Sequence, residues 1–495
     1  MSTMAERLAE IEAAPAGAKT VAFFDFDGTI IDGYSASAML KRRAREGDLG
    51  PLEFTRLLLG YVEVSAGRQE FDAFMRGGVR ALAGKPEADV RKLGDRLLRS
   101  ALGGALFKEA WALVAAHRER GHRIVLATSA LPFQVEPLAE ELGADDVLCT
   151  RLAVRDGVLT GEVDGAVLWG SGKADAVKGY ARSKRVSLKR CFAYGNGGED
   201  LEYLSLVGHP RPVNADAELA AAAAQRGWPV TAFEHTGGPG LQEIVRTAAT
   251  YGSMAVSLAG GVAVSLLNRR RREGVNLTIG VGSDVALSLA GVQVDVTGAE
   301  HLWSHRPAVF IFNHQSWLDG FIIMKLLRQD VTGVSKAEVA GQPGLGQFAK
   351  FLNMAFIDRA DGARAREALG PVVDRIEEGY SIVLAPEGTR SITPRVGPFK
   401  KGAFHMAMQG GVPVVPIVIR NAGELLWRGS TFMRPGTVDV HVLPPVPTGG
   451  WTLEDLDARV SAVRQDFVDT LAHWPSSGGR TKSPPAGDAS PAGEE

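Results

Sequence analysis

The sequence predicts an α/β protein made of two domains in tandem, with an apolar helical element between them. Both halves contain short apolar runs, such as residues 21–24 and 308–312, that end in polar clusters, as central parallel strands do. Residues 247–267 carry no charge and separate the two halves. A chain of 495 residues also exceeds the usual size of a single hydrophobic core.

The overall composition is that of an ordinary globular protein, with 45% hydrophobic and 23% charged residues. A net charge of −2 argues against nucleic acid as a partner. Cys149 and Cys191 lie in apolar, strand-like segments and predict buried thiols in a reducing cytosol. Residues 1–17 are polar and lack the apolar core of a signal peptide, and residues 475–495 have the composition of a disordered tail.

The first polar cluster contains two carboxylates at the end of a strand-like run. Asp25 and Asp27 follow residues 21–24 and are two positions apart, so both side chains lean into one pocket at the carboxyl end of a strand. Open α/β sheets bind ligands at that edge. Paired carboxylates there can bind Mg²⁺, with one attacking a phosphoryl group and the other moving protons. The alternative interpretation is a simple Asp-Gly turn.

Three later segments favour phosphoryl chemistry. Thr128 follows the strand-like residues 124–127, Lys173 opens a predicted helix, and Asp200 lies in an acidic loop after the strand-like residues 191–194. Nucleophile, hydroxyl, lysine and acidic loop in this order resemble the haloacid dehalogenase superfamily, in the branch that contains phosphoserine phosphatase. The Gly-x-Gly-Lys before this helix is not a nucleotide P-loop, because it lacks the upstream glycine and the following Ser or Thr.

The resemblance implies a Rossmann-like domain in which Asp25 is the nucleophile and Asp27 the acid and base. Thr128 and Lys173 would hold the phosphoryl oxygens, and residues 33–106, which have helical periodicity, would form a cap over the site. The implied ligands of Mg²⁺ are side chains at the strand ends: Asp25, Asp27, Asn196 and Asp200.

Two positions depart from that family pattern. Asn196 stands where the family places an aspartate that binds Mg²⁺, and a neutral amide ligand predicts weaker metal binding. Tyr34 stands nine residues beyond the nucleophile, where phosphoserine phosphatases carry a glutamate that recognises the amino group. We therefore expect a substrate other than phosphoserine, and a regulatory or binding module remains the alternative for this domain.

The joint between the halves predicts membrane association. Residues 247–267 are long enough to span a bilayer, but they are built of Ala, Gly, Ser and Val, and four arginines follow at residues 269–272. A single crossing would place the two domains on opposite sides of the membrane. We expect instead a helical pair, completed by residues 275–294, that lies in the cytoplasmic leaflet with its arginines on anionic headgroups. A buried Ala/Gly-rich helix of a soluble domain is the alternative.

The second half contains a histidine and an aspartate at a strand-to-helix junction. Asn313-His314-Gln315-Ser316-Trp317-Leu318-Asp319 follows residues 308–312 and precedes an apolar run. Asp319 can accept a proton from one imidazole nitrogen of His314 and leave the other as a general base. This is a triad without its own nucleophile, so a substrate hydroxyl would attack.

Three further blocks follow that motif: Phe356-Ile357-Asp358-Arg359, Pro386-Glu387-Gly388-Thr389-Arg390-Ser391 and Val414-Val415-Pro416-Ile417. The four blocks in this order resemble the glycerolipid acyltransferases that acylate 1-acylglycerol-3-phosphate, over about residues 275 to 450. The resemblance implies transfer from an acyl thioester, either acyl-CoA or acyl-carrier protein, to the 2-hydroxyl of lysophosphatidate.

In that reaction a lipid phosphate must be held beside the base. The predicted substrate-binding residues are cations and the loop around Gly388: Lys336, Arg359, Glu387, Gly388, Thr389 and Arg390. A guanidinium can grip phosphate with two hydrogen bonds. We expect Glu387 to bind the acceptor or order the loop, and backbone amides near Gly388 to stabilise the oxyanion.

The predicted domain limits follow from these segments. Residues 18–236 form the haloacid dehalogenase-like domain, residues 237–298 the linker and membrane-associating helices, and residues 299–474 the α/β acyltransferase domain. The expected location is the cytoplasmic face of the cell membrane.

Overall fold

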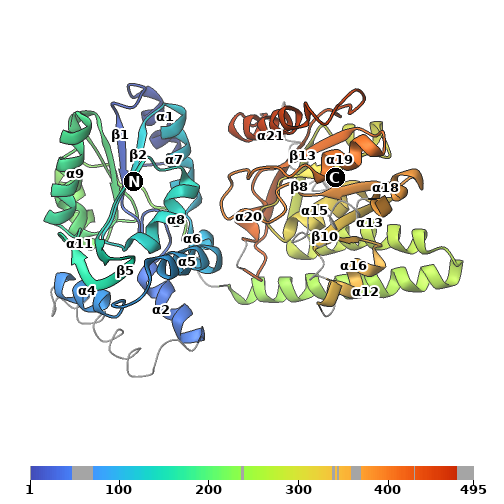
Figure 1. Ribbon diagram of the computed structural model, residues 1–495, viewed down its shortest axis with the longest axis horizontal. Coiled ribbons are helices and arrows are strands. Elements are labelled where there is room, and N and C mark those ends of the chain that lie inside the picture. Colours follow the sequence, from blue (N-terminus) through green and yellow to red (C-terminus); the bar gives the residue numbers. More distant parts are fainter. Residues whose placement is uncertain are drawn as a thin grey trace, which may run out of the picture.

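The computed structural model describes residues 2–46, 71–235, 239–336, 340–342, 345–357, 370–427 and 430–475. Figure 1 shows two α/β domains in tandem, each built on its own sheet, with the long helix α12 beneath the second domain. The predicted α/β class and tandem arrangement are confirmed.

The first domain contains a five-stranded parallel sheet in the order β3-β2-β1-β6-β7. Its strands are β1 (Val21–Phe24), β2 (Arg123–Ala127), β3 (Asp146–Leu148), β6 (Phe192–Gly195) and β7 (His209–Pro212). The apolar runs that predicted strands in this half form β1, β2 and β6, each within one residue of the expected ends. Cys149 and Cys191 are free and buried, as predicted.

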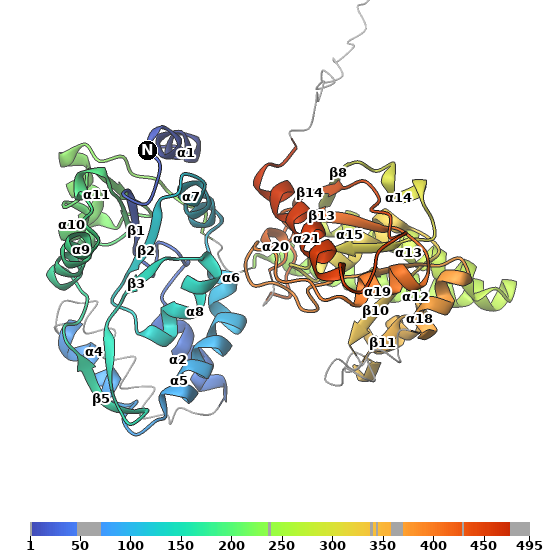
Figure 2. The same ribbon diagram turned by 45° about the horizontal axis from the view of Figure 1, so that its top comes forward.

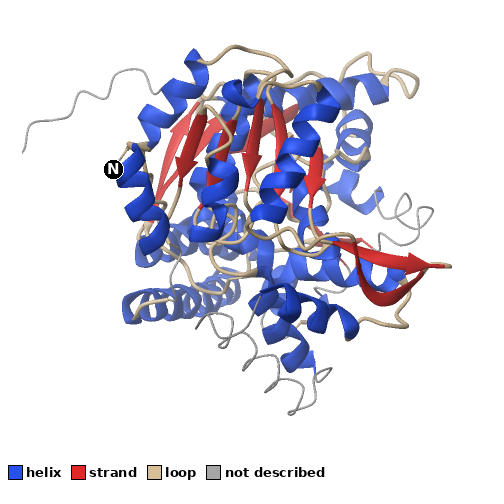
Figure 3. Cartoon of the chain, turned by 90° about the vertical axis from the view of Figure 1, so that its left-hand side faces the viewer, coloured by secondary structure: helices blue, strands red, loops and turns tan. Residues whose placement is uncertain are grey.

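Helices cover both faces of this sheet (Figure 3). The side chains of β1 alternate between two cores, with Phe24 in one and Phe23 in the other. The Phe24 side is covered by α1 (Met4–Ala13), α7 (Lys108–Glu119) and α8 (Pro132–Leu142). The Phe23 side is covered by α9 (Ser171–Lys184), α10 (Leu201–Leu204) and α11 (Ala217–Arg226).

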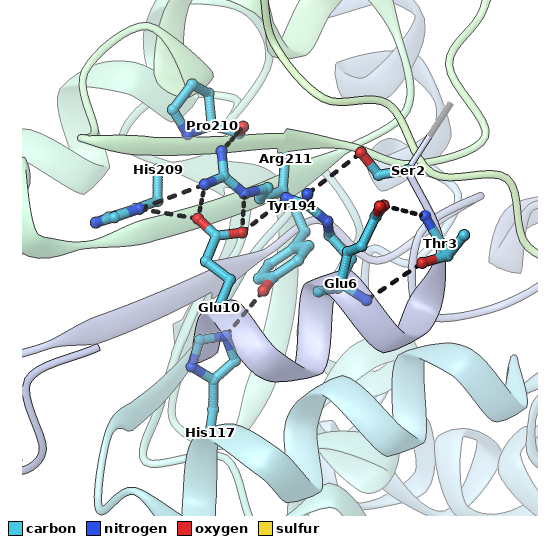
Figure 4. A network of polar contacts seen from close by, with 10 residues as sticks. Ser2, Thr3, Glu6, Glu10, His117, Tyr194, His209, Pro210 and Arg211 are labelled. Atoms are coloured by element: carbon cyan, nitrogen blue, oxygen red, sulfur yellow. Dashed lines mark hydrogen bonds and ion pairs between the residues drawn. The ribbon is translucent and has the colours of Figure 1, made fainter. Parts of the chain in front are cut away.

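Residues 2–17, which precede the predicted start of this domain at residue 18, are folded onto it. The carboxylate of Glu10, on α1, accepts a hydrogen bond of 2.8 Å from Nε of Arg211, and His209 Nδ1 lies 3.2 Å from it (Figure 4). Both partners belong to β7. The half-buried ion pair therefore fixes α1 across the edge of the sheet.

The described part of the predicted cap is helical. It comprises α2 (Ser35–Glu46), α4 (Phe71–Arg80), α5 (Glu87–Leu97), a π-helical turn (Leu98–Leu102) and the short α6 (Gly103–Ala105). The hairpin of β4 (Arg151–Arg155) and β5 (Val158–Asp164), which was not expected from the sequence, extends from the sheet in Figure 3. Leu159 of this hairpin shares an apolar cluster with Val79 and Val90, so the hairpin is packed on the cap.

The second domain contains a seven-stranded sheet in the order β11-β10-β12-β9-β13-β14-β8, in which only β13 and β14 pair antiparallel. Its strands are β8 (Val292–Thr297), β9 (Val309–Phe312), β10 (Val331–Lys336), β11 (Ala355–Ile357), β12 (Ser381–Leu384), β13 (Val414–Ile419) and β14 (Gly436–Val442). The expected strand at residues 308–312 forms β9, and the block at residues 414–417 lies in β13. The predicted domain limit at residue 299 excludes β8, although β8 is an edge strand of this sheet.

Two helical layers enclose the second sheet (Figure 2). One face is covered by α13 (Arg271–Ala290) and α15 (Leu318–Leu327), and the other by α18 (Gly370–Glu377), α19 (Gly402–Gln409) and α21 (Leu456–Ala472). The described residues of this domain also form the short helices α14 (His301–Ser304), α16 (Leu345–Phe351) and α20 (Ala422–Leu425). Phe310 and Ile311 of β9 point into opposite cores, so this strand is buried on both faces.

The apolar joint forms a helical pair, α12 (Leu241–Asn268) and α13. α12 is long and apolar enough to cross a membrane, yet only 11% of its most apolar 18-residue window is buried. This exposure contradicts the alternative of a buried helix. The second apolar stretch, residues 275–294, was expected to be helical throughout. The helix ends at Ala290, because Gly291 adopts a left-handed conformation and the chain continues into β8.

Candidate active sites

The first site lies at the carboxyl ends of β1, β2 and β6, where the parallel strands bring their polar clusters together. Lys173, at the start of α9, is buried, and its Nζ lies 2.7 Å from Asp25 and 2.5 Å from Asp200. Burial alone would lower the pKa of Lys173, but the carboxylates of Asp200 and Asp25 outweigh it and raise that pKa. The lysine is therefore a fixed positive charge between two carboxylates.

Asp27 has a different environment from Asp25. Its two carboxylate oxygens accept hydrogen bonds from the amide and the hydroxyl of Ser35, at 2.7 and 3.1 Å. Burial raises the pKa of Asp27 to about 6, although the bonds from Ser35 act in the opposite direction. A carboxyl group with this pKa can hold and release a proton near neutral pH, as a general acid must.

Thr128, Asn196 and Asp200 complete the first site. Thr128 is buried at the end of β2, and its hydroxyl accepts the amide of Ala130 at 3.1 Å. Asn196 Oδ1 accepts a hydrogen bond of 3.2 Å from the hydroxyl of Thr29. Asp200 Oδ2 accepts the amide of Asn196 at 3.0 Å, so this carboxylate orders the loop as well as pairing with the lysine.

The predicted metal site contains few side-chain oxygens that could bind an ion. Among the described residues, no three His, Cys, Asp or Glu side chains are arranged to hold a metal ion. Both oxygens of Asp27 and both of Asp200 accept hydrogen bonds. Asp25 is bonded to Lys173 through Oδ1 alone, and Oδ1 of Asn196 accepts a single bond, from Thr29, so these two residues keep oxygen sites that could bind a metal. Mg²⁺ is often held by one or two carboxylates together with water and substrate phosphate, so this small oxygen set fits a weakly held Mg²⁺.

The second site is formed by the loop between β9 and α15. Nδ1 of His314 lies 2.8 Å from Oδ2 of Asp319, as the sequence predicts. The same oxygen accepts the amides of Gln315 and Ser316 at 2.7 and 2.8 Å, and Asp319 is completely buried. A carboxylate acceptor requires the proton on Nδ1, so Nε2 is the unprotonated nitrogen. Nε2 makes no hydrogen bond with the described residues, and a quarter of the histidine side chain is exposed.

The loop that contains Glu387 is hydrogen-bonded to the backbone of His314. Oε1 of Glu387 accepts the amide of His314 at 2.8 Å, and Oε2 accepts the amide of Gly397 at 2.7 Å. Ser391 donates its amide and its hydroxyl to the carbonyl of His314, at 2.7 and 3.1 Å. These contacts favour the loop-ordering role for Glu387, one of the two roles expected from the sequence.

Of the three predicted phosphate-binding cations, the structure describes the side chain of Arg390 alone. The guanidinium of Arg390 lies 4.7 Å from the centre of the Trp317 ring, and burial lowers its pKa. Thr389 is exposed beside it. Lys336 ends β10, but the structure describes only its backbone, and Arg359 lies outside the described residues. The amide of Gly388 donates to the carbonyl of Ala385 at 3.1 Å, so this amide has a partner within its own turn.

Comparison with known proteins relates each half of the chain to a protein family. A haloacid dehalogenase-like hydrolase model matches residues 22–205, and an acyltransferase model matches residues 293–420. A protein of Mycobacterium tuberculosis named "probable phosphatase" is 34% identical over 267 residues, covering 51% of this chain and 90% of its own length. A 1-acyl-sn-glycerol-3-phosphate acyltransferase of Cocos nucifera is 32% identical over 238 residues, covering 47% of this chain and 76% of its own length. The chain belongs to both families.

A further acyltransferase of the same name, from Limnanthes alba, is 37% identical over 185 residues, which cover 37% of this chain. The chain spans 65% of the length of that relative.

Three further residues, for which the sequence predicted no role, shape these two sites. Ser35, which holds Asp27 in the hydrolase-like domain, opens α2, and a serine at a helix start was the available signal. Ser391 belongs to the predicted block of residues 386–391 and donates twice to the carbonyl of His314. Asn313 exchanges two hydrogen bonds of 2.7 Å with the backbone of Ile419, which fixes the loop of His314 to β13.

Proposed function

We propose that the second domain transfers an acyl group from an acyl thioester to the 2-hydroxyl of 1-acylglycerol-3-phosphate, giving phosphatidate for phospholipid biosynthesis. The observation that carries this proposal is the pair of His314 and Asp319, with Nδ1 held by a buried carboxylate and Nε2 open to a substrate. The acyl donor is acyl-CoA or acyl-carrier protein. The names of the related acyltransferases support the choice of acceptor.

The reaction follows from the protonation state of the pair. Nε2 of His314 removes the proton of the acceptor hydroxyl as its oxygen attacks the thioester carbonyl, and Asp319 stabilises the imidazolium. The carbon–sulfur bond breaks, and the thiolate leaves with the proton that His314 returns. Arg390 binds the acceptor phosphate while stacking on Trp317 keeps its guanidinium near the histidine. The chemistry of this domain requires no metal.

We propose that the first domain is a phosphomonoester hydrolase. Asp25 attacks phosphorus, Asp27 donates a proton to the leaving alcohol, and a water then hydrolyses the aspartyl phosphate with Asp27 as base. Lys173 and Thr128 bind the phosphoryl oxygens. Mg²⁺, held by Asp25 and Asn196, would supply positive charge that offsets the charge of the phosphoryl group. The alternative is a catalytically weak regulatory module, which the replacement of a carboxylate by Asn196 favours.

We also propose that the helical pair binds the cytoplasmic leaflet. Large apolar side chains on α12 are strongly exposed, among them Val256 at 72%, Leu266 at 73% and Leu267 at 82%. α13 contributes a second exposed row while its opposite face enters the core of the acyltransferase domain. An exposed apolar surface of this extent is typical of a membrane-binding element.

The arginines at residues 269–272 contribute less to headgroup binding than the sequence suggests. Arg271 donates to the carbonyl of Lys350 at 2.6 Å, and Arg272 donates to Asp330 at 2.6 Å. Arg270 pairs with Glu273 at 3.0 Å. Three of the four cations are thus engaged by the protein, and the apolar face of α12 provides most of the proposed affinity for the membrane.

The acyltransferase proposal is tested with purified full-length protein, lysophosphatidate and acyl-CoA or acyl-carrier protein, with products identified by mass. His314→Ala should reduce acyl transfer by roughly 10²–10⁴-fold, because it removes the general base. His305→Ala is the matched control, because this exposed histidine of the same domain is bonded only to Ser304 among the described residues. Near-normal transfer by His314→Ala would refute the proposal.

The hydrolase proposal is tested with a panel that includes phosphatidate, lysophosphatidate, phosphoserine and an aryl phosphate, with and without Mg²⁺. Turnover that depends on Mg²⁺ and is lost in Asp25→Asn supports a working hydrolase. Absence of turnover across the panel would favour the regulatory-module alternative.

Membrane binding is tested by flotation with vesicles that contain anionic lipid. Leu266→Glu should weaken binding, whereas Leu453→Glu, an equally exposed position at 71%, should not. These point changes are better than deleting the helical pair, because α13 residues such as Ile279 and Leu287 are part of the acyltransferase core. Unchanged flotation of Leu266→Glu would contradict the proposed surface. In protease protection, both domains should be accessible from the cytoplasmic side.

A further inference from the structure

The loop that carries the catalytic histidine is held by two neighbouring loops of its own domain. Ser391 donates twice to the carbonyl of His314, at 2.7 and 3.1 Å. On the other side, the hydroxyl of Ser316, within the same motif, donates to the carbonyl of Leu426. The backbone position of the general base therefore depends on where residues 391 and 426 lie.

The next residue of each of these two loops reaches the hydrolase-like domain. Ile392, which follows Ser391, packs against the apolar core of the first domain. Trp427 follows Leu426, and its ring lies against Gly104 of α6. Two side chains adjacent to the clamped catalytic loop thus rest on the other domain.

The surface that receives them is made of two consecutive glycines. A Cβ atom on Gly103 would collide with the side chain of Ile392, and a Cβ atom on Gly104 would collide with the ring of Trp427. Neither glycine has a positive φ. Their lack of a side chain therefore serves close approach rather than backbone conformation.

Polar contacts continue the same interface. The hydroxyl of Thr393, a buried residue, lies 3.4 Å from the carboxylate of Glu141, and Arg395 donates to the carbonyl of Glu140 at 3.3 Å. Both acceptors belong to the C-terminal end of α8. The segment that leaves the Glu387–Arg390 loop is therefore attached to the first domain over four residues.

The residues that follow the glycine pair are bonded to the nucleophile loop of the hydrolase-like domain. The amide of Asp32 donates to the carbonyl of Ala105 at 2.6 Å, and the amide of Phe107 donates to the carbonyl of Ile30 at 3.0 Å. The contact surface is thus a firmly bonded part of the first domain and can act as a fixed support.

We propose that Gly103 and Gly104 form a docking surface on which the acyltransferase domain positions its catalytic loop, so that acyl transfer depends on the hydrolase-like domain. Ile392 and Trp427 are positioning residues that act on His314 through Ser391 and Leu426. This inference rests on the proposed acyl transfer and adds that the site is complete only when the two domains are in contact. It applies whether or not the first domain hydrolyses a phosphate ester.

The test adds a single methyl group to the docking surface of the full-length protein. Gly104→Ala should lower kcat of acyl transfer by about tenfold or more with little change in KM for lysophosphatidate, because a shift of roughly 1 Å in a catalytic group can cost about 10²-fold. Gly77→Ala is the matched control, since this helical glycine of the same domain has open space where its Cβ would lie. A general loss of folding would also lower the melting temperature, which serves as an internal readout.

A compensating change decides whether the contact itself is responsible. Trp427→Leu makes room for the added methyl group, so kcat of Gly104→Ala/Trp427→Leu should exceed that of Gly104→Ala and match that of Trp427→Leu. Wild-type acyl transfer in Gly104→Ala, or a loss that Trp427→Leu does not relieve, would overturn the inference and leave the proposed function standing. Absence of acyl transfer in the wild-type protein would overturn both.

Discussion

Replacement of Asp319 by asparagine separates two roles of this carboxylate, which keeps the proton on Nδ1 of His314 and supplies a negative charge. Oδ2 accepts hydrogen bonds from Nδ1 of His314 and from the amides of Gln315 and Ser316. The two backbone amides require an oxygen at that position, so the new side chain should place its carbonyl oxygen there and keep the proton on Nδ1. The variant therefore preserves the tautomer and loses only the negative charge.

The size of the effect follows from that geometry. A charge pair about 4 Å apart at an effective dielectric constant of about 20 interacts by about 4 kcal/mol, which corresponds to about 10³ in rate. Because a quarter of the His314 side chain is exposed, solvent screens part of this interaction. We expect kcat of acyl transfer in Asp319→Asn to fall by about 10²–10³-fold, with KM for lysophosphatidate nearly unchanged.

The same substitution should also lower the free energy of unfolding. Oδ1 of Asp319 is buried without a hydrogen-bond partner among the described residues, and the new amide nitrogen would occupy that place. A buried donor without a partner costs roughly 1–3 kcal/mol. Asp319→Ala, which leaves three N–H groups without their acceptor, should be less stable still.

The assay is steady-state acyl transfer together with urea unfolding of each variant. A rate of Asp319→Asn within a few-fold of wild type would refute the electrostatic role of the carboxylate. A rate as low as that of His314→Ala, with unchanged stability, would show instead that the amide had turned and reversed the tautomer of the histidine.

Two further predictions concern the hydrolase-like domain. Ser35→Ala removes a hydrogen bond that lowers the pKa of Asp27, so the acid form should persist to higher pH. The alkaline fall of kcat/KM should then move up by about one pH unit, since a hydrogen bond to a charged group is worth roughly 1.5 kcal/mol, and a pH–rate profile that does not move would exclude Asp27 as the acid. Asn196→Asp adds a carboxylate ligand and should reduce the Mg²⁺ concentration needed for half-maximal turnover, while identical, tight saturation in both proteins would show that Asn196 is not a limiting ligand.

Local sequence patterns predicted the central strands and the residues at their ends. Asp25, Thr128 and His314 were identifiable because parallel strands bring their carboxyl ends to one edge, whatever the length of chain between them. Their hydrogen-bond partners were harder to predict. Ser35 and Ser391 reach the functional groups because of the conformations of the loops that precede them. The spacing of apolar residues in the sequence does not determine these conformations.

The place of β8 in the second sheet and the contact between the domains were not predicted, for two different reasons. β8 alternates apolar and polar residues over 292–297, as a half-buried edge strand does, but it directly follows an apolar helix and was included in that stretch. The contact of Gly103 and Gly104 with Ile392 and Trp427 joins positions about 300 residues apart through surface shape, for which a single sequence contains no pattern.

The position of β8 has a consequence for the order in which the protein folds. β8 pairs only with β14, and Val292 is matched to Gly436, so this edge of the sheet must wait for 144 further residues to be synthesised. At about 5–20 residues per second, the ribosome takes roughly 7–30 s to make them. During that time the helical pair has emerged, but the sheet that receives the inner face of α13 is incomplete. A nearby membrane can shield both apolar faces in this interval, so nascent chains arrested before Gly436 should bind vesicles more strongly than the finished protein does.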